Sequence, residues 1–519
     1  MKLTGFLFAA ALLGACTQPA AEENYTRHVD PKIGTGGHGH VFVGANVPFG
    51  LVQVGPTSIP QTWDWCSGYH ASDSTVIGFS HTHLSGTGIG DLFDVTVMPV
   101  TGDVTYARGT EDDPTSGLWS YADRTQEIAR PGYYSVPLTR YGIRAELTAT
   151  ARVGLHRYTF PASDAAAVVF DLENGGCWDK ATETHLAKEG DRTVTGWRHS
   201  TGWAKDQRVY FVAEFSKPFE KFETIGDNYA RASFRTTDGE QVSLKVALSP
   251  VSVEGARENL AAELPGWDFE ETAKAADKAW NDELSKVKIE TEDETSKRIF
   301  YTALYHTMVA PSLFCDVNGD YYGSDHAIHR NADFTNYTTF SLWDTYRAAM
   351  PLMTVLHPEK MADIVQTMLH IADEQGRLPV WHLWGNETDC MVGNPGIVAV
   401  ADAIVKGIGG FDREKAFEAI RKTAMNPDRG NGLRMEYGYI PCEMFNEAVA
   451  YDMEYALADG AAARAAETLG KAEDAKYFEE RSHSYRNYFD PATRFMRGRD
   501  SKKGWRTPFN AFASTHRAD

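Results

Sequence analysis

The spacing of apolar residues divides the chain into two halves. From residue 24 to about residue 265, short runs rich in Val, Tyr and Thr are separated by Gly, Asp or Pro, as in "DVTVMPV", "AAVVFDL" and "VSLKVAL". Short strands with turn residues at this spacing are typical of an antiparallel β-sandwich. From "GWDFEETAKAADKAW" onward the apolar period becomes helical, with few strands. The pattern therefore predicts a multidomain β + α protein.

Connections of alternating length organise the helical half. We predict helices near 295–312, 341–355, 359–373, 396–407, 413–424, 445–458 and 460–488. Long loops and tight turns alternate between them. Antiparallel helices connected in this way place every long loop at one end of the domain, where function concentrates. The arrangement predicts an (α/α)6 barrel with acidic residues gathered on one face: Asp344, Glu387, Asp389, Glu436, Glu443 and Glu447.

An (α/α)6 barrel needs twelve helices, and the pattern supplies only about seven or eight. We therefore expect the barrel to be incomplete in this chain and Asp519 not to be the natural end of the protein. The domain organisation predicted is a signal peptide (1–16), a tether (17–24), a β-sandwich (25–265), a helical linker (266–294) and a partial barrel (295–519).

The N-terminus has the features of an export signal. Lys2 precedes an apolar run that ends in "LLGAC" at Cys16, and the run is too short to span a membrane. The residues "LGAC" resemble a bacterial lipobox, which implies cleavage before Cys16 and lipid attachment there. Thr17 resembles the residue that sends lipoproteins to an outer membrane. We expect a lipid-anchored protein of a Gram-negative cell envelope, in the periplasm or outer membrane; ordinary signal cleavage is the alternative.

Charge and cysteine content exclude some classes of protein. The formal net charge is −20, so nucleic acid is not an expected partner. Besides Cys16 there are five cysteines and no CxxC pair, which is not a disulfide framework. The 12 Trp and 23 Tyr suit a sugar-binding protein, but aromatic residues fill cores equally well.

The stretch "SLWDTYR" (341–347) poses the main question about a site. Ser341 and Asp344 fit a variant of the capping box, and an acid in a first helical turn is stabilised by the helix dipole. Because this acid also belongs to the predicted face of acidic loops, contact with a ligand is the competing interpretation.

Long stretches of the chain resemble glycoside hydrolase family 92, the bacterial α-mannosidases. They include "VDPKIGTGGHGHVFVGANVPFGLVQVGP", "DSTVIGFSHTHLSGTG", "SLWDTYRAAMPLMTVLHPEK", "GRLPVWHLWGNETDC" and "YGYIPCEMFNEAVAYDMEYALADG". The resemblance implies a β-sandwich and an (α/α)6 barrel with a site between them. It also implies an exo-acting, inverting mannosidase of mannose-containing glycans, with a Ca²⁺ ion that holds two mannose hydroxyls. The linkage cleaved stays open.

The resemblance also implies where the catalytic pair lies. An inverting glycosidase uses an acid and a base whose carboxyl groups are about 6.5–9.5 Å apart. The family's "EGNAWQY"-like and "DDCGQMSAW"-like segments do not occur in this chain, so we expect both residues beyond Asp519. Residues 1–519 alone are therefore expected to be inactive, and the catalytic residues are unknown.

Substrate-binding residues are carried over at the matching positions. Asp344 matches the family's acid that grips mannose, and Trp343 precedes it. We also expect contacts from Glu387 and Trp384 in the second aromatic loop, and from Trp65 and His83 in "TWDWCSGYH" and "FSHTHLSGTG". The alternatives are purely structural: Trp343 and Trp384 would pack in the core, and Glu387 would accept hydrogen bonds from the local backbone.

Two further functions compete with the mannosidase. A glycan-binding surface lipoprotein without catalysis would also lack the acid and the base. A zinc hydrolase could use the pairs His38–His40 and His81–His83, because residues two apart on a strand face one side. No Cys or carboxylate completes either pair by its spacing.

Overall fold

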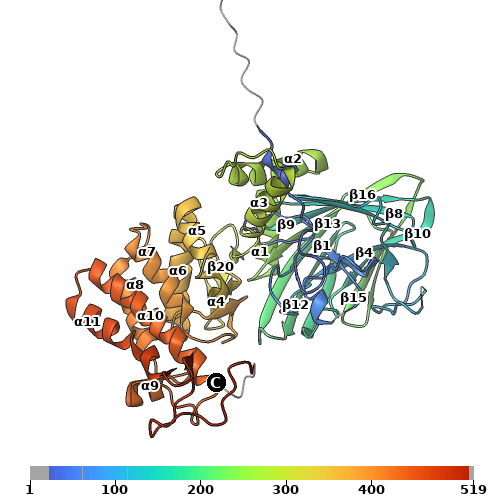
Figure 1. The fold of residues 1–519 in the computed structure, drawn as a ribbon. Coiled ribbons are helices and arrows are strands. Elements are labelled where there is room, and N and C mark those ends of the chain that lie inside the picture. The colour runs from blue at the N-terminus through green and yellow to red at the C-terminus, as the bar shows by residue number, and fades with distance from the viewer. Residues whose placement is uncertain (1–22, 61, 114, 514–519) are drawn as a thin grey trace, which may run out of the picture.

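The computed structural model describes residues 23–60, 62–113 and 115–513, which form a β-rich domain beside a helical one (Figure 1). The predicted signal peptide, Cys16 and most of the tether lie outside the described residues. None of the helices described is both long and apolar enough to cross a membrane.

Two antiparallel sheets form the β-sandwich. The six-stranded sheet has the order β1 (Gly55–Thr57), β3 (Gly78–Ser80), β4 (Thr96–Thr101), β10 (Ser163–Asp171), β15 (Tyr229–Thr236) and β14 (Lys221–Ile225). The eight-stranded sheet has the order β11 (Lys180–Glu189), β12 (Thr193–Thr201), β13 (Gln207–Phe215), β16 (Glu240–Ser249), β9 (Val153–Phe160), β8 (Ile143–Ala149), β7 (Tyr133–Leu138) and β6 (Ile128–Arg130).

The core of the sandwich lies between these sheets. Aromatic rings from both sheets meet there: Phe170 of β10 stacks on Phe211 of β13, with centroids 6.1 Å apart. Alternation fixes which side chains face inward, because successive residues of a strand point to opposite faces. In β8, for example, Ile143 and Ala145 are buried while Arg144 and Glu146 are only half-buried.

Helices α1 (Val253–Glu263) and α2 (Phe269–Leu284) cover the outer face of the eight-stranded sheet. The N-caps Ser252 and Asp268 accept hydrogen bonds from the first turns of these helices. Leu260 of α1 and Phe269 of α2 join one buried cluster with apolar residues of the sheet. The predicted domain boundary near residue 265 falls between α1 and α2.

The helical domain consists of paired antiparallel helices. They are α3 (Glu294–His306), α4 (Leu342–Thr345), α5 (Ala349–Leu356), α6 (Pro358–Gln375), α7 (Pro395–Val405), α8 (Arg413–Met425), α9 (Asn431–Tyr437), α10 (Ala448–Thr468) and α11 (Ala472–Arg481). Long connections follow α3, α6 and α8, and tight turns follow α5, α7 and α10, so the predicted alternation is confirmed. The predicted β-sandwich followed by a domain of α/α pairs is therefore confirmed.

Short strands and 3₁₀ helices complete the loops. The strands are β2 (Thr75–Val76), β5 (Ser120–Tyr121), β17 (Ser312–Leu313), β18 (Tyr321–Tyr322), β19 (Ile328–His329), β20 (Tyr337–Thr338), β21 (Phe340–Ser341), β22 (Trp381–Leu383), β23 (Asn386–Glu387), β24 (Phe489–Asp490) and β25 (Phe495–Met496). The 3₁₀ helices are η1 (Tyr25–His28), η2 (Trp63–Trp65) and η3 (Ser484–Asn487).

Two helix predictions are corrected by the structure. The helix predicted at 341–355 is broken into α4 and α5. The turn predicted near Gly460 is absent, because α10 runs through that glycine to Thr468. Alanine, the best helix former, flanks Gly460 and outweighs its propensity cost of about 1 kcal/mol. The turn occurs instead at Gly470, whose φ of 73° suits glycine.

The segment before β1 joins the two domains. Asn46 is fully buried; its backbone oxygen accepts a hydrogen bond from Trp280 Nε1 at 2.7 Å, and its Oδ1 accepts one from Tyr305 Oη at 3.2 Å. Phe49 continues the junction through its backbone, donating to Met308 O at 2.8 Å. The β-sandwich is thereby fastened to α2 and α3.

A buried ionic network anchors α9 within the long loop after α8. Arg434 donates to Asp452 and Asp459 of α10 at 2.6 Å each, and all three side chains are at most 3% exposed. Tyr488 completes the network by donating to Asp452 Oδ2 at 2.8 Å. Charges buried together in this way must remain paired, because a lone buried charge is strongly unfavourable.

Candidate functional site

Side chains from both domains enclose a cavity of about 260 Å³. The β-sandwich contributes the loop between β3 and β4, and the helical domain contributes the end of α3 and the region of α4 and α5. The lining residues are Ser85, Gly86, Thr87, His306, Thr307, Ala310, Pro311, Thr339, Ser341, Asp344, Thr345, Ala349, Met350 and Met353. Among these residues Asp344 is the one carboxylate.

Asp344 is oriented within this cavity by its neighbour in the chain. Ser341 Oγ donates a hydrogen bond of 2.6 Å to Asp344 Oδ2, and Ser341 is buried at the end of strand β21. The hydroxyl makes no cap bond to the backbone of α4. The capping-box interpretation of this pair is therefore wrong, and Ser341 instead fixes the carboxylate, which is itself exposed.

Two polar atoms of cavity residues are buried without a hydrogen-bond partner among the described residues: His306 Nε2 and Thr87 Oγ1. Burial lowers the pKa of His306 to about 4, so its imidazole is neutral at neutral pH. Buried polar groups are almost always hydrogen-bonded, so these two unpaired atoms are exceptions. Each atom is buried from solvent in this structure, although its residue lines the cavity. Sequence reasoning did not identify either residue.

Trp343 lies beside Asp344 and is held from the other side. The central guanidinium carbon of Arg347 lies 4.6 Å from the centroid of the Trp343 ring, and Arg347 Nη2 donates a hydrogen bond to Glu454 Oε1 at 2.7 Å. Trp343 Nε1 is another buried donor that lacks a partner among the described residues. The side chain is partly buried and does not line the cavity, so the structure does not place it against a ligand there.

The loop that closes the cavity from the β-sandwich is tied to the segment around His40. Gly86 N donates to His40 O at 2.7 Å, and Phe42 N donates to Ser85 Oγ at 3.2 Å. Trp63 Nε1 holds the far side of the loop by donating to Gly88 O at 3.1 Å. These bonds position Thr87 opposite α3.

Trp384 and Glu387 are not brought into the cavity. Trp384 is 2% exposed and packs on Phe314 in the sandwich core, with ring centroids 5.1 Å apart. A sugar could not reach that ring, so the structure corrects its assignment to a sugar platform. Glu387 accepts hydrogen bonds from the backbone N–H of Val380 (2.8 Å), Trp381 (2.9 Å) and Asp389 (2.9 Å), and so holds its own loop together.

Trp65 and His83 also lie outside the cavity lining. Trp65 Nε1 donates to Asp73 Oδ2 at 2.9 Å, and its ring packs on His70. His83 is 3% exposed, its Nδ1 lies 2.8 Å from Gln53 O, and burial lowers its pKa to about 4. Both residues brace the β-sandwich next to the closing loop. The other acids predicted for this face are likewise not among the lining residues: Asp389, Glu436, Glu443 and Glu447.

The histidine pairs considered for zinc are used differently. His81 is fully buried, with Nδ1 2.6 Å from Val95 O and Nε2 2.8 Å from His156 Nε2. His38 and His40 face the single carboxylate of Asp64. Among the described residues, neither pair belongs to a group of three potential metal ligands.

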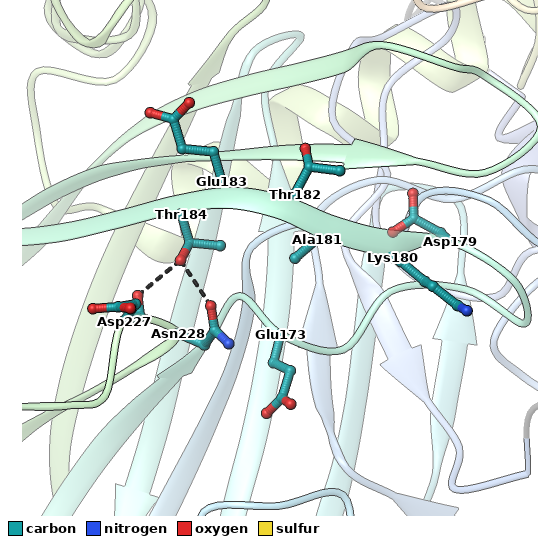
Figure 2. A pocket seen from close by; sticks show the side chains of 9 residues that line it. All are labelled: Glu173, Asp179, Lys180, Ala181, Thr182, Glu183, Thr184, Asp227 and Asn228. Carbon is teal, nitrogen blue, oxygen red and sulfur yellow. Dashed lines mark hydrogen bonds between the residues drawn. The ribbon is translucent and has the colours of Figure 1, made fainter.

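A larger cavity, of about 580 Å³, lies in the β-sandwich near β11 and the turn before β15 (Figure 2). Figure 2 shows Thr184 pointing toward Asp227 and Asn228, and its Oγ1 donates to Asp227 O at 2.8 Å. The nine residues that line this cavity include no aromatic side chain. Because both domains contribute to the smaller cavity, it is the better candidate for a functional site.

The architecture and the position of this cavity define a class of protein: a β-sandwich followed by an α/α-barrel domain, with a site to which both domains contribute. Sequence comparison makes the assignment specific. The family description "Glycosyl hydrolase family 92 N-terminal domain" matches residues 28–249, and "Glycosyl hydrolase family 92 catalytic domain" matches residues 255–519. The chain belongs to glycosyl hydrolase family 92, and the predicted family is confirmed.

Solved structures and a curated relative agree with this assignment. A family GH92 α-mannosidase of Bacteroides thetaiotaomicron, solved in complex with mannoimidazole, superposes with a TM-score of 0.91 at 40% identity, covering 94% of this chain and 67% of that chain. An inverting GH92 mannosidase of the same species gives a TM-score of 0.87 at 28% identity, covering 97% and 70%. A protein of Arthroderma benhamiae, described as an uncharacterized secreted glycosidase, is 26% identical over 92% of this chain and 64% of its own length.

We expect the neutral state of His306 to make stability depend on pH. Its pKa is about 4 in the folded protein, against about 6.5 when unfolded. Between these values the unfolded chain binds the proton more readily, so its contribution to stability is present above pH 6.5 and is lost as the pH falls toward 4. From pH 6.5 to 4.5, wild type should lose roughly 1–3 kcal/mol more than His306→Gln. Urea unfolding across this range measures the difference, and equal losses would contradict it.

Proposed function

We propose that this protein is an exo-acting, inverting α-mannosidase and that the cavity around Asp344 binds the terminal mannose. The observation that carries the proposal is the grouping of an exposed, oriented carboxylate with two buried polar atoms that lack partners, on Thr87 and His306. The carboxylate is open to a sugar hydroxyl, whereas the Thr87 and His306 atoms become reachable only when their side chains move on binding. Kinship with GH92 α-mannosidases, one of them solved with a mannose-like ligand, supports mannose.

Each group has a defined part in this proposal. The Asp344 carboxylate accepts hydrogen bonds from sugar hydroxyls, and Ser341 fixes its direction. Once that movement exposes them, the neutral His306 Nε2 and the Thr87 hydroxyl, which lie on opposite domains, pair with further hydroxyls. Such positioning lowers the barrier by holding the sugar in the reactive orientation. No acid or base is assigned, because the described lining offers a single carboxylate and inversion requires two.

We further propose that Ca²⁺ assists, as the family resemblance implies. Ca²⁺ takes 6–8 oxygen ligands, often carboxylates. The described cavity residues supply one carboxylate, so they do not form a Ca²⁺ site by themselves. When bound, the ion would hold sugar hydroxyls.

The alternative function, glycan binding without catalysis, uses the same cavity and differs only in whether mannose is released.

We expect Asp344→Asn to reduce kcat/KM on an aryl α-mannoside by about 30- to 1,000-fold, equivalent to about 2–4 kcal/mol. Stability should change by at most about 1 kcal/mol, because Asn is nearly isosteric and its oxygen still accepts from Ser341. The assay uses the product of the full reading frame that contains residues 1–519. Glu359→Gln is the matched control: it also removes an exposed acid from a first helical turn, but outside the cavity. A lowered melting temperature with unchanged kcat/KM would reduce Asp344 to a structural residue.

The stereochemistry tests the reaction class. Proton NMR of that product acting on an α-mannoside should show β-mannose first, and EDTA should abolish the rate. Assaying residues 1–519 in parallel tests the expectation that they alone release no mannose. First-formed α-mannose would indicate retention. Binding of mannoimidazole without turnover by either protein would favour the glycan-binding alternative.

We also propose that the protein is lipid-anchored through Cys16, on the strength of "LLGAC". In a Gram-negative host, wild type should fractionate with membranes and Cys16→Ser should be released from them. The relative described as secreted is consistent with export of the chain. Equal fractionation of both proteins with the soluble material would refute the anchor.

A further inference from the structure

A second group of chemically active side chains lies away from the cavity, where the β18–β19 hairpin meets the C-terminal end of α6. His329 comes from β19, Asp325 from the tip of the hairpin and Glu374 from α6. One potential ligand atom from each lies within 4.8 Å of the other two. His329 Nε2 is 3.1 Å from Asp325 Oδ1 and 3.5 Å from Glu374 Oε1, so one imidazole nitrogen faces two carboxylates.

Neighbouring groups fix the direction of these ligand atoms. Tyr321 Oη donates to Glu374 Oε1 at 2.9 Å, and Ser324 N donates to Glu374 Oε2 at 2.7 Å. The His329 ring stacks on Tyr321 with centroids 4.8 Å apart and planes 10° apart. Metal sites depend on such outer contacts, which hold ligands in place before the ion binds.

Gly323 leaves room for the group to converge. A Cβ atom at this position would lie 2.7 Å from both Asp325 Oδ1 and His329 Nε2, closer than side chains pack. Glycine at this position therefore lets the two ligand atoms approach the backbone closely, and a Cβ atom would force their side-chain ends to shift.

Among the described residues, neither carboxylate pairs with a Lys or an Arg, and the cationic partner that faces both is His329 when it is protonated. Arg330 pairs with Asp320, and Lys415 pairs with Asp373 at 2.7 Å. The Glu374 side chain is only 6% exposed. A buried carboxylate next to a second one is unfavourable unless positive charge is brought in.

We propose that Asp325, His329 and Glu374 bind a divalent transition-metal ion of the Zn²⁺ class, with water completing the coordination. One imidazole and two carboxylates are usual zinc ligands, whereas Ca²⁺ prefers oxygen ligands alone. This site is separate from the Ca²⁺ proposed for the sugar and takes no part in hydrolysis.

The ion would clamp the hairpin to α6 and so stabilise the contact between domains. From the same hairpin, Tyr322 Oη donates to Asp206 Oδ2 of the β-sandwich at 2.9 Å. His326 Nδ1 lies 2.8 Å from that Tyr322 hydroxyl. Asn386 Nδ2 reinforces the junction by donating to Asp206 O at 2.9 Å.

The test is Zn²⁺ titration of untagged, EDTA-treated residues 1–519, followed by calorimetry and by melting temperature. We expect one Zn²⁺ per chain, a raised melting temperature, and Co²⁺ substitution that gives the visible absorption of a four- or five-coordinate site. His329→Ala and Asp325→Asn should each weaken binding by about 100-fold or more. The second variant lies on an exposed hairpin tip and keeps the test valid if the first does not fold.

His483→Ala is the matched control. His483 also has a carboxylate four residues earlier, Glu479, and the two are exposed to similar degrees, 39% and 40%. It belongs to no group of three ligands among the described residues, so its replacement should leave Zn²⁺ affinity unchanged. No Zn²⁺ binding by wild type, equal binding by His329→Ala, or equal competition by Ca²⁺ would each overturn the proposal. None of these readouts depends on mannosidase activity.

Discussion

The candidate site depends on the way Asn46 is buried between α2 and α3. Its two hydrogen bonds, to Trp280 and Tyr305, are shielded from water, where such bonds are strong, and its Nδ2 is buried without a partner among the described residues. Tyr305 directly precedes His306, which lines the cavity. The contact that fastens the domains therefore also sets how far His306 lies from the loop of Thr87.

The cavity belongs to neither domain alone, and this division has a chemical consequence. One wall carries the carboxylate and the neutral imidazole, and the other carries the Thr87 hydroxyl. The sugar proposed for this cavity would therefore have to contact both domains, and apolar side chains such as Met350 and Met353 form part of the same lining.

The sequence predicted the regular parts of this molecule well, because local pattern determines them. Apolar alternation identified strands such as β8, and the rhythm of loops identified the α/α pairs. Asp344 was found because a family motif carries it. His306 and Thr87 were missed, since their role arises only where two domains meet. Trp384 was assigned to a sugar platform with a core role left open; its ring is buried, and its φ of 49° is a conformation that no local pattern indicates.

The alternation of long loops and tight turns separates stability from specificity. The tight turns lie at one end of the helical domain and keep the helices packed, and the long loops lie at the other end. The length of a long loop can change at little cost in stability, since doubling a flexible loop costs about 0.6 kcal/mol. The loop that contains α9 is an exception, because Arg434 ties it to α10 through buried charges. The loops after α3 and α6 are held as well, by Tyr322 on Asp206 and by Glu387 on its own backbone, so insertions in any of the three loops should be tolerated only away from these contacts.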